Sequence, residues 1–395
     1  MVIPSFQFFG NRRLVFGEGK LAMLPDILAS LGGKALIVTG AASLQHGTKW
    51  ELLQEALRKK RIEYTTFSVS REPSPEMIDA AVARFRKDNL KAVVGLGGGS
   101  AVDAGKAISA MLPQEGFTEE YLEGVGVKEH NGRKVPFIAV PTTSGTGSEA
   151  TKNAVLSRIY PSPSGKKGFK KSLRHDHLIP DVALLDPELT FSCPPQVTAA
   201  CGMDALAQLL EAYLSPKASP LTDALALDGI SALKDALIPA FSYGSQNLQV
   251  RSAMAYAAYL SGVVLANAGL GVIHGFASSI AAYFDIPHGV ICGTLAGVCT
   301  AKNIEILKKK SGMLALEKYA KIGTLFAGKA GTMEENLDSL IRQIQLWTDA
   351  LNLPALHTLG IQEGDIERLA EETEIKSNPV PLGKEDLKEI LRRRW

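Results

Sequence analysis

The stretch that decides the fold is KAVVGLGGGSAVDAGKA, residues Lys91–Ala107. A continuous apolar run, typical of a buried parallel strand, leads into three consecutive glycines and then into a helical pattern. Consecutive glycines let backbone N–H groups approach a ligand, and the start of the following helix favours an anion. The stretch predicts a strand, a pyrophosphate-binding loop and a helix, with a plain strand-to-helix turn as the alternative. The glycines follow a later strand of the unit, so their spacing is not the usual dinucleotide fingerprint.

Strand and helix patterns alternate on both sides of this stretch. Lys34–Gly40 is an apolar run that ends in glycine, and Ile62–Val69 is rich in β-branched and aromatic residues, so both are expected to be strands. A helical pattern lies between them, and Ser74 is expected to cap the next helix. Two further strands are predicted in VPFIAVPTT (135–143) and DVALLD (181–186). Strands separated by helices indicate a parallel sheet with helices on both faces.

The two ends of the chain depart from this pattern. FQFF (6–9) and RLVFG (13–17) are expected to form a short hairpin joined by Gly10 and Asn11. After Asp186 and Pro187 the strand signals stop, and the apolar residues recur at helical period. The chain of 395 residues is therefore expected to divide into an α/β dinucleotide-binding domain, 1–186, and an all-helical domain, 187–395.

Composition limits the class of protein. Hydrophobic residues make up 46% and charged residues 21%, which is an ordinary globular balance, and the formal net charge is +2. Basic residues are not clustered as a nucleic-acid surface requires, so no nucleic-acid partner is expected. No signal peptide and no apolar run of about 18 residues are visible, so we expect no membrane span and a cytoplasmic location. Four cysteines without a C-x-x-C pair predict free, buried thiols.

A second glycine loop, PTTSGTGSEAT (141–151), follows another apolar strand. Its small hydroxyl side chains and accessible amides suit contacts to ribose or phosphate. Because the carboxyl ends of parallel strands share one edge of the sheet, both glycine loops should face the same crevice. The basic segment GKKGFKK (165–171) is, on composition, a solvated loop, with a phosphate contact as the alternative.

A metal site is one hypothesis for the helical half. In GMDALAQLLEAY (202–213), Asp204 and Gln208 are four residues apart and share one helix face. His274 and His288 lie in apolar surroundings, where a histidine is usually a core residue with satisfied hydrogen bonds. Two histidines and a carboxylate also suit Fe(II) or Zn(II), but their spacing does not show that they converge. The other five histidines are expected at the surface.

Five motifs together resemble those of the iron-containing alcohol dehydrogenases over nearly the full length. They are, in order, GGGSAVDAGKA, PTTSGTGSEAT, PDVALLDPELT, GMDALAQLLEAY and GLGVIHGFASSIAAYFDIPHG. The resemblance implies an α/β Rossmann-like nucleotide-binding domain, an all-α metal-binding domain and a cleft between them. This is the architecture that the family shares with dehydroquinate synthase.

The resemblance places the metal ligands on Asp204, Gln208, His274 and His288, and implies a catalytic role for Asp204, His274 and His288. Histidine is usual at the second position, so Gln208 is a departure. Its amide oxygen can still act as a ligand, and we expect Fe(II) or Zn(II) to bind less tightly than usual, with a metal-free protein as the alternative. Ser278 stands where the family often has a histidine near the nicotinamide, which removes the basis for a histidine proton relay there.

The cofactor residues also follow from the resemblance. They are Gly97, Gly98 and Ser100 for the pyrophosphate, with Asp103 nearby, then Thr142, Thr143 and Thr146 along the nucleotide, and Lys170. Gly40 stands where members that prefer NAD often have an aspartate, which would repel a 2′-phosphate. Without that repulsion, and with Ser43 able to donate to the phosphate, NADP(H) is the preferred cofactor and NAD(H) the alternative.

The expected function is a metal-dependent, NAD(P)(H)-linked alcohol dehydrogenase or aldehyde reductase that acts on a small alcohol or aldehyde. One alternative is a metal-independent reductase such as the maleylacetate reductases. Another is a dehydroquinate-synthase-like lyase, which would need several basic residues near the metal, and the helical half has few around Asp204 or His274. A third is a non-catalytic nucleotide-binding protein. A homodimer or higher homo-oligomer is expected, with the N-terminal strands pairing across subunits.

Overall fold

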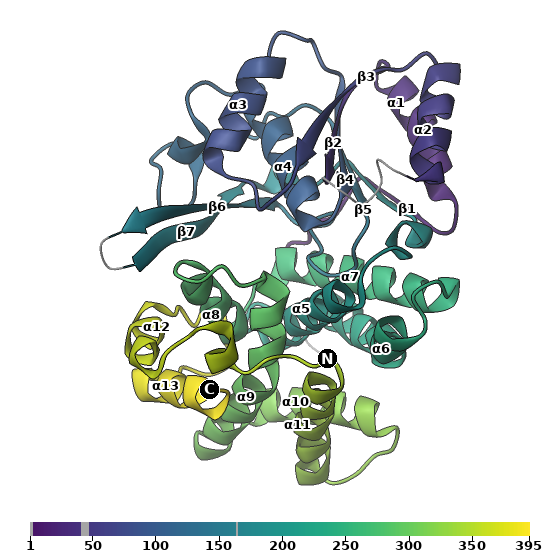
Figure 1. Cartoon of the computed structure of the whole chain (residues 1–395). Helices are drawn as coiled ribbons and strands as arrows, with labels where there is room; N and C mark the ends of the chain where they lie inside the picture. The colour runs from purple at the N-terminus through teal and green to yellow at the C-terminus, as the bar shows by residue number, and fades with distance from the viewer. Residues whose placement is uncertain (1–2, 41–46, 163–164) are drawn as a thin grey trace.

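The structure, a computed structural model, describes residues 3–40, 47–162 and 165–395, with side chains described in these ranges outside 159–167. An α/β half lies above a helical half in Figure 1. The α/β half contains β1 (Arg13–Phe16), α1 (Leu24–Ser30), β2 (Lys34–Gly40), α2 (Thr48–Lys59), β3 (Glu63–Val69), α3 (Pro75–Phe85), β4 (Ala92–Gly97), α4 (Gly99–Met111), β5 (Phe137–Pro141), β6 (Asn153–Ser162), β7 (Gly165–Arg174) and β8 (Val182–Leu185).

Six of these strands form one parallel sheet in the order β1-β8-β5-β4-β2-β3. Successive residues of β2 point to opposite faces. Leu36 and Val38 pack with α3 and α4 on one face, and Ala35 and Ile37 pack with α1 and α2 on the other. Because both faces are buried, the strand reads as a continuous apolar run. The predicted α/β fold with helices on both faces is confirmed.

The N-terminal hairpin expected from FQFF and RLVFG is wrong. No strand precedes Arg13 in the described part of this segment, and β1 pairs in parallel with β8. The side-chain amide of Asn11 donates to the backbone oxygens of Glu149 and Pro180, at 2.8 Å each. The residue that looked like half of a two-residue turn therefore fastens the N-terminal segment to two loops of the α/β half.

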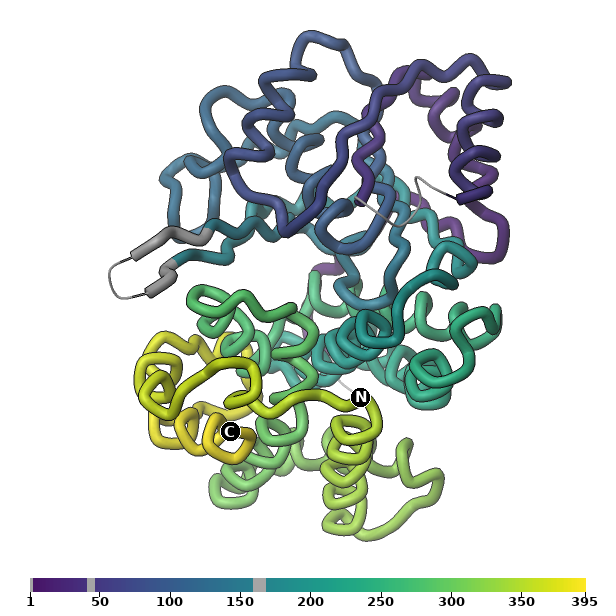
Figure 2. The backbone as a smooth tube through the Cα atoms, viewed as in Figure 1, coloured from purple at the N-terminus to yellow at the C-terminus, as the bar shows by residue number. Residues whose placement is uncertain are grey.

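An antiparallel hairpin of β6 and β7 stands where composition indicates a solvated loop. That expectation is wrong because residues 165–171 belong to β7 and pair with β6, and the hairpin buries Ala154, Leu156 and Leu173. None of these three buried residues lies within GKKGFKK, so that segment read alone does not show the strand pattern. β7 runs beside α8 of the helical half, as the backbone tube in Figure 2 shows, so the hairpin carries Lys170 across the space between the halves.

The helical half has a single large apolar core. Its helices are α5 (Pro195–Leu214), α6 (Pro220–Ser242), α7 (Leu248–Ala268), α8 (Val272–Ala281), α9 (His288–Lys309), α10 (Met313–Ala327), α11 (Met333–Ala350), α12 (Ile366–Glu372) and α13 (Lys384–Arg393). Between α7 and α8 the chain bends by 96°. Gly269 makes this bend with φ 78°, a left-handed conformation that favours glycine.

Three remaining predictions concern a membrane span, the cysteines and the surface histidines. α9 is long and apolar enough to cross a membrane by length and composition, but 67% of its apolar window is buried inside the protein, as in a core helix. The four cysteines are free, and all but Cys201 are buried. The expectation of a surface position is wrong for His130, which is 7% exposed because its ring bonds the backbone of Ala110 and Gly132.

Candidate metal and nucleotide site

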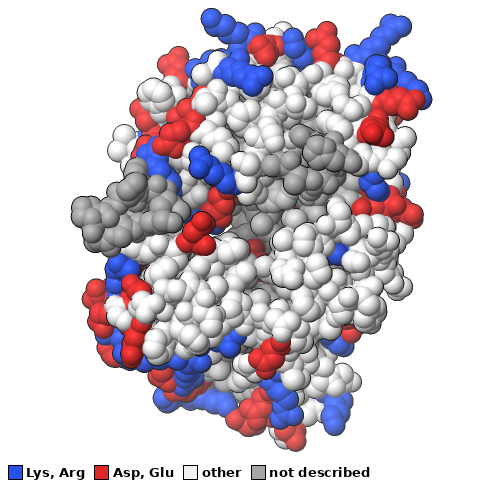
Figure 3. Space-filling view, viewed as in Figure 1, with Lys and Arg blue, Asp and Glu red and all other residues white. Residues whose placement is uncertain are grey.

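A cleft of about 660 Å³ separates the two halves, at the carboxyl ends of the sheet strands. This is where open α/β sheets bind ligands. Its walls come from the glycine loops and β7 on one side and from α5, α8 and the start of α9 on the other. In Figure 3 the molecule is hollowed between the halves, and most charged side chains lie toward the outer parts of this face.

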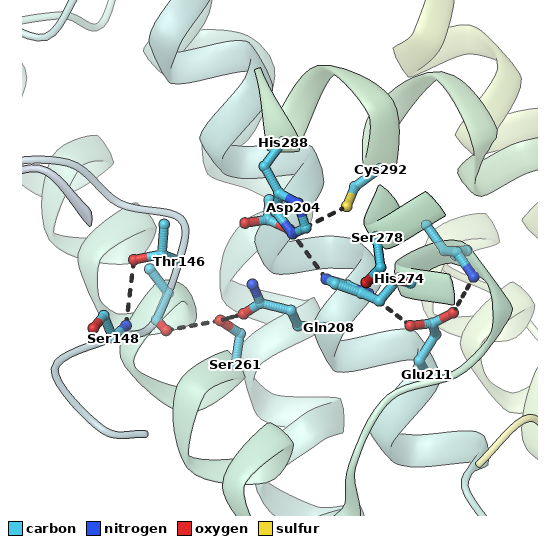
Figure 4. Close-up of polar contacts among 12 residues, drawn as sticks. Thr146, Ser148, Asp204, Gln208, Glu211, Ser261, His274, Ser278, His288 and Cys292 are labelled. Carbon is cyan, nitrogen blue, oxygen red and sulfur yellow. Dashed lines mark hydrogen bonds and ion pairs between the residues drawn. The ribbon is translucent and has the colours of Figure 1, made fainter. Parts of the chain in front are cut away.

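Three side chains of the helical half converge on the floor of the cleft. Asp204 lies near the middle of α5, His274 in the first turn of α8, and His288 is the first residue of α9, directly after Pro287. Asp204 Oδ1 is 3.2 Å from His274 Nε2 and 3.8 Å from His288 Nε2. The chain brings together residues that are up to 84 positions apart, as the view in Figure 4 shows.

Cys292 joins these three residues and was not among the expected ligands. It is fully buried, one turn after His288 on α9, and its Sγ lies 3.7 Å from His288 Nε2. One ligand atom from each of the four residues lies within 4.8 Å of the others. The spacing His288-x3-Cys292 was the available signal, but a cysteine in an apolar helix reads as core.

Glu211 holds the ring of His274 from behind. Its Oε2 is 2.7 Å from His274 Nδ1, and its Oε1 accepts a 2.5 Å hydrogen bond from the backbone N–H of Ile273. Both contacts are buried. A carboxylate on Nδ1 leaves Nε2 as the ring nitrogen that faces Asp204, which is the usual arrangement behind a metal-binding histidine. Glu211 lies seven residues after Asp204, two turns along the same helix face.

The electrostatics of this cluster favour a cation. Burial would raise the pKa of Asp204, but the His288 and His274 rings outweigh it and hold that pKa below its ordinary value. Burial lowers the pKa of His288 to about 3, so its ring is neutral and can offer a lone pair. Burial opposes the charged form of His274, but Cys292 and Glu211 outweigh it and raise the pKa of that ring well above its ordinary value, so a metal would displace a proton from His274. A carboxylate and imidazoles that have lost this proton are suitable ligands for Fe(II) or Zn(II). The donor set therefore fits a divalent metal.

Gln208 lies beside the cluster but is turned from it. It is one turn after Asp204 on α5, lines the cleft and is 3% exposed. Its Oε1 is 2.7 Å from Ser261 Oγ on α7. In Figure 4 the amide nitrogen is the atom on the Asp204 side. The structure thus brings Asp204, His274 and His288 together and leaves Gln208 with a protein partner.

The first glycine loop is closely packed. Gly98 precedes α4 as its N-cap, and a Cβ on Gly99 would lie 2.6 Å from Thr146 Cγ2. The loops therefore fit together only because glycine is present. Of the residues predicted at the cofactor, Gly98, Ser100, Thr143 and Thr146 line the cleft. Gly97 and Thr142 lie just behind, joined by a 2.9 Å hydrogen bond from Thr142 N to Gly97 O.

Asp103 and Lys106 tie α4 to the second loop. Asp103 lines the cleft, accepts a hydrogen bond from Ser148 Oγ and accepts another from Val155 N at 3.2 Å. The ammonium group of Lys106, 1% exposed, donates to the backbone oxygens of Ser148, Thr151 and Asn153 at 2.7 to 2.9 Å. Lys106 was not singled out from the sequence, where a helical lysine reads as a surface residue.

Three further cofactor predictions concern the other end of the cleft. Lys170 on β7 lines the cleft and forms an ion pair with Glu72. Gly40, the last residue of β2, also lines it. Ser43 lies outside the described residues. Arg71, which was not expected, lines the cleft two residues after Val69, the β3 residue that pairs with Gly40.

Comparisons with known proteins agree with this geometry. The family described as "Iron-containing alcohol dehydrogenase" matches residues 11–187, and "Fe-containing alcohol dehydrogenase family, C-terminal" matches 198–395. An NADPH-dependent butanol dehydrogenase from Clostridium saccharobutylicum is 30% identical, over 96% of this chain and 95% of its own. An NAD-dependent methanol dehydrogenase from Bacillus methanolicus is 29% identical, over 98% of both. A crystal structure of a 1,3-propanediol oxidoreductase superposes with a TM-score of 0.86 at 29% identity, over 99% of this chain and 100% of the other.

Proposed function

The chain belongs to the iron-containing alcohol dehydrogenase family and is an NAD(P)-linked alcohol dehydrogenase, and we propose that a divalent metal at Asp204, His274 and His288 serves its reaction. The observation that carries the proposal is the convergence of these ligands on the floor of the cleft, facing the glycine loops. The substrate is a small alcohol or aldehyde. Hydride passes between its carbon and the nicotinamide.

The residues of the cleft position the substrate and the nicotinamide cofactor. When bound, the metal acts as a Lewis acid toward the oxygen of the alcohol or aldehyde. The glycine loop before α4 presents backbone N–H groups to the pyrophosphate, and Asp103 and Lys106 fix the second loop against that helix. Glu211 orients His274. Holding cofactor and substrate in one orientation supplies a large part of the rate.

Gln208 becomes a fourth ligand if its amide is rotated by half a turn. Ser261 Oγ is 2.7 Å from Gln208 Oε1 and also 2.8 Å from the backbone oxygen of Ala258, but a hydroxyl has one proton to donate. When that proton goes to Ala258, the NH2 group of Gln208 must face Ser261. Its oxygen then faces Asp204, where a cation attracts it. Amide oxygen and nitrogen are assigned from such networks.

The preferred cofactor is NADP(H). Gly40 at the end of β2 presents no carboxylate to a 2′-phosphate, and Arg71 after the neighbouring strand offers a guanidinium at the same edge. An arginine near this position accommodates the 2′-phosphate in dinucleotide-binding folds. Arg71→Ala should therefore raise KM for NADPH and leave KM for NADH little changed.

The test measures NADPH oxidation with butanal. Metal-stripped protein is compared with the same protein after anaerobic loading with Fe(II) or with Zn(II), and Asp204→Asn is the variant. Asp235→Asn, at a carboxylate that is 80% exposed, is the matched control. Activity that returns on loading in the parent and in Asp235→Asn, but not in Asp204→Asn, supports the proposal. Equal activity with and without metal would assign the metal-independent reductase instead.

Location and assembly belong to the same proposal. Free, mostly buried thiols suit a reducing compartment, which supports the cytoplasm. β1 is an edge strand of the sheet, and an open edge can pair with that of another copy. A homodimer through this edge is the assembly that we propose.

A further inference from the structure

Besides Arg71, the cleft wall carries three basic side chains, and of these only Lys170 is an expected cofactor residue. The helical half has few basic residues in the sequence around Asp204 and His274, but the fold brings Lys170 and Arg174 on β7, and Lys376, to the cleft wall. Lys170 forms an ion pair with Glu72, and Arg174 lies 3.3 Å from Glu123. Among the residues that the structure describes, Lys376 has no carboxylate within ion-pair distance.

The ammonium group of Lys376 lies on the metal side of the cleft. Its Nζ is 3.3 Å from Ser278 Oγ. Ser278 is one turn after His274 on α8, and its hydroxyl donates to the backbone oxygen of His274 at 2.8 Å. Side chains one turn apart have Cβ atoms about 5 to 6 Å apart. Lys376 and Ser278 line the same cleft as His274 and His288, and Figure 4 shows Ser278 beside His274.

The backbone at Lys376 forms a turn that is held against the helical half. The residue has φ 50°, a left-handed conformation that is unfavourable for a side chain of this kind. The backbone N–H of Ser377 donates to Leu270 O at 2.8 Å, and a Cβ on Gly275 would lie 2.0 Å from Glu374 O. The turn thus lies directly on α8. Backbone strain that the surroundings enforce is often found at ligand sites.

We propose that Lys376 and Ser278 form an anion subsite for the substrate, and this rests on the function proposed above. The substrate class is a short aldehyde with an anionic tail, whether a carboxylate, a sulfonate or a phosphonate. The tail binds the ammonium group of Lys376, and the Ser278 hydroxyl donates to it when its proton turns away from His274 O, while the carbonyl lies at the Asp204, His274 and His288 cluster. From the spacing of one helix turn, about one to three carbons separate the two ends. The carbonyl carbon takes hydride from NADPH and the oxygen takes a proton, which gives the hydroxy acid and NADP+.

The test compares charged and neutral aldehydes of similar size. kcat/KM is measured with NADPH and metal-loaded protein for 4-oxobutanoate against butanal, and for sulfoacetaldehyde and phosphonoacetaldehyde against propanal. The variant is Lys376→Met, and the matched control is Lys384→Met, whose lysine pairs with Glu371 at the surface of α13. The three anions show which tail the subsite prefers.

We expect the parent and Lys384→Met to prefer the anionic aldehydes. Lys376→Met should lower the ratio of anionic to neutral kcat/KM by about 10- to 100-fold, as for loss of one hydrogen bond to a charged group. A parent that reduces butanal as well as 4-oxobutanoate overturns the subsite and leaves the proposed function standing. A higher KM for NADPH in Lys376→Met, with the aldehyde ratio unchanged, would assign Lys376 to the cofactor. If no aldehyde is reduced, the proposed function itself fails.

The binding of an unreactive anion gives a second readout. Succinate has two carboxylates and no aldehyde, so it can occupy the subsite without turnover. Its Kd for the protein with NADP+ should rise in Lys376→Met and stay constant in Lys384→Met. Equal Kd values in all three proteins would overturn the subsite, whatever the activity of the variants.

Discussion

At the scale of single residues, Glu211 decides which nitrogen of His274 faces the metal position. Its carboxylate takes the Nδ1 side at 2.7 Å, and the backbone of Ile273 fixes its other oxygen. Glu211→Gln keeps the size but exchanges one acceptor oxygen for a donor. We expect its affinity for Zn(II), measured by competition with a chelator, to fall about 10- to 100-fold. Glu367→Gln, on the surface of α12, is the control, and equal affinities in the two variants would contradict this role.

Whether Gln208 or Cys292 is the fourth ligand depends on one atom, the amide oxygen of Gln208 or the sulfur of Cys292. The rotated amide of Gln208 predicts only oxygen and nitrogen neighbours around bound Zn(II). X-ray absorption of the Zn-loaded protein should then show no sulfur at about 2.3 Å, and Cys292→Ser should keep its metal while Gln208→Leu binds it less tightly. A sulfur neighbour that disappears in Cys292→Ser would assign Cys292 in place of Gln208.

Glu149 predicts a pH dependence of stability. Burial raises its pKa to about 7 in the folded protein, although Lys106 opposes the shift, against an ordinary value of 4.5. Between these values the unfolded chain loses the proton and the folded protein keeps it, so the free energy of unfolding falls as the pH rises. The total is about 3 kcal/mol from this group.

Glu149→Gln should remove this contribution. The test is the change in urea midpoint between pH 4.5 and pH 8 in the parent and the variant, since other groups contribute equally to both. The parent should lose more stability on going to pH 8. The same change in both proteins would show that Glu149 ionises normally in the folded state.

At the scale of elements, the second glycine loop is seated on α7 by two glycines. A Cβ on Gly262 would lie 2.2 Å from the backbone oxygen of Gly147, and Gly147 itself has φ 61°. Because the obstacle is backbone, no change of side-chain rotamer relieves it. Gly262→Ala should lower the free energy of unfolding by about 1 to 3 kcal/mol and weaken NADPH binding. Gly364→Ala, which meets no atom within 4 Å, is the control in thermal unfolding and cofactor titration. Equal melting temperatures of Gly262→Ala and Gly364→Ala would show that the loop moves to accommodate the added methyl group.

The elements differ in how far their sequence predicts them. β2 and β4 were predictable because burial on both faces produces an apolar run that needs no knowledge of the partner strands. β6 and β7 were not, since the buried residues Ala154, Leu156 and Leu173 lie outside the lysine-rich segment 165–171, which shows no apolar run. Gly10 and Asn11 suggested a turn, but Asn11 is used for two long-range hydrogen bonds.

The candidate site shows the same limit. Asp204, His274 and His288 could be named because their residue types and surrounding motifs resemble a known family. Glu211, Cys292 and Lys376 carry no such mark. Their places follow from the packing of α5, α8 and α9 and from a turn near residue 376, which depend on contacts between distant parts of the chain.

At the scale of the whole molecule, the apolar N-terminal segment predicts the assembly. Ile3, Phe6, Phe8 and Leu14 are 41 to 64% exposed, and Leu14 lies on the edge strand β1. A second copy that pairs along this edge would cover Leu14, and the other three residues lie on the segment that leads into the edge strand. We expect a dimeric mass in light scattering at micromolar protein and a monomeric mass when Phe6, Phe8 and Leu14 are all changed to Ser. Val127→Ser, at a residue that is 96% exposed, should leave the mass unchanged. A monomeric parent would contradict the dimer.

The turn that carries Lys376 has a consequence for how such a protein diversifies. It belongs to neither the sheet nor the helices that hold Asp204, His274 and His288, and its backbone is held by a hydrogen bond to Leu270 and by close packing of Glu374 on Gly275. A substitution of Lys376 should therefore leave the metal ligands and the cofactor-binding loops in place. Gene duplication followed by substitution at this one turn could give paralogues that share a reaction and divide its substrates by charge, and an engineer could follow the same route.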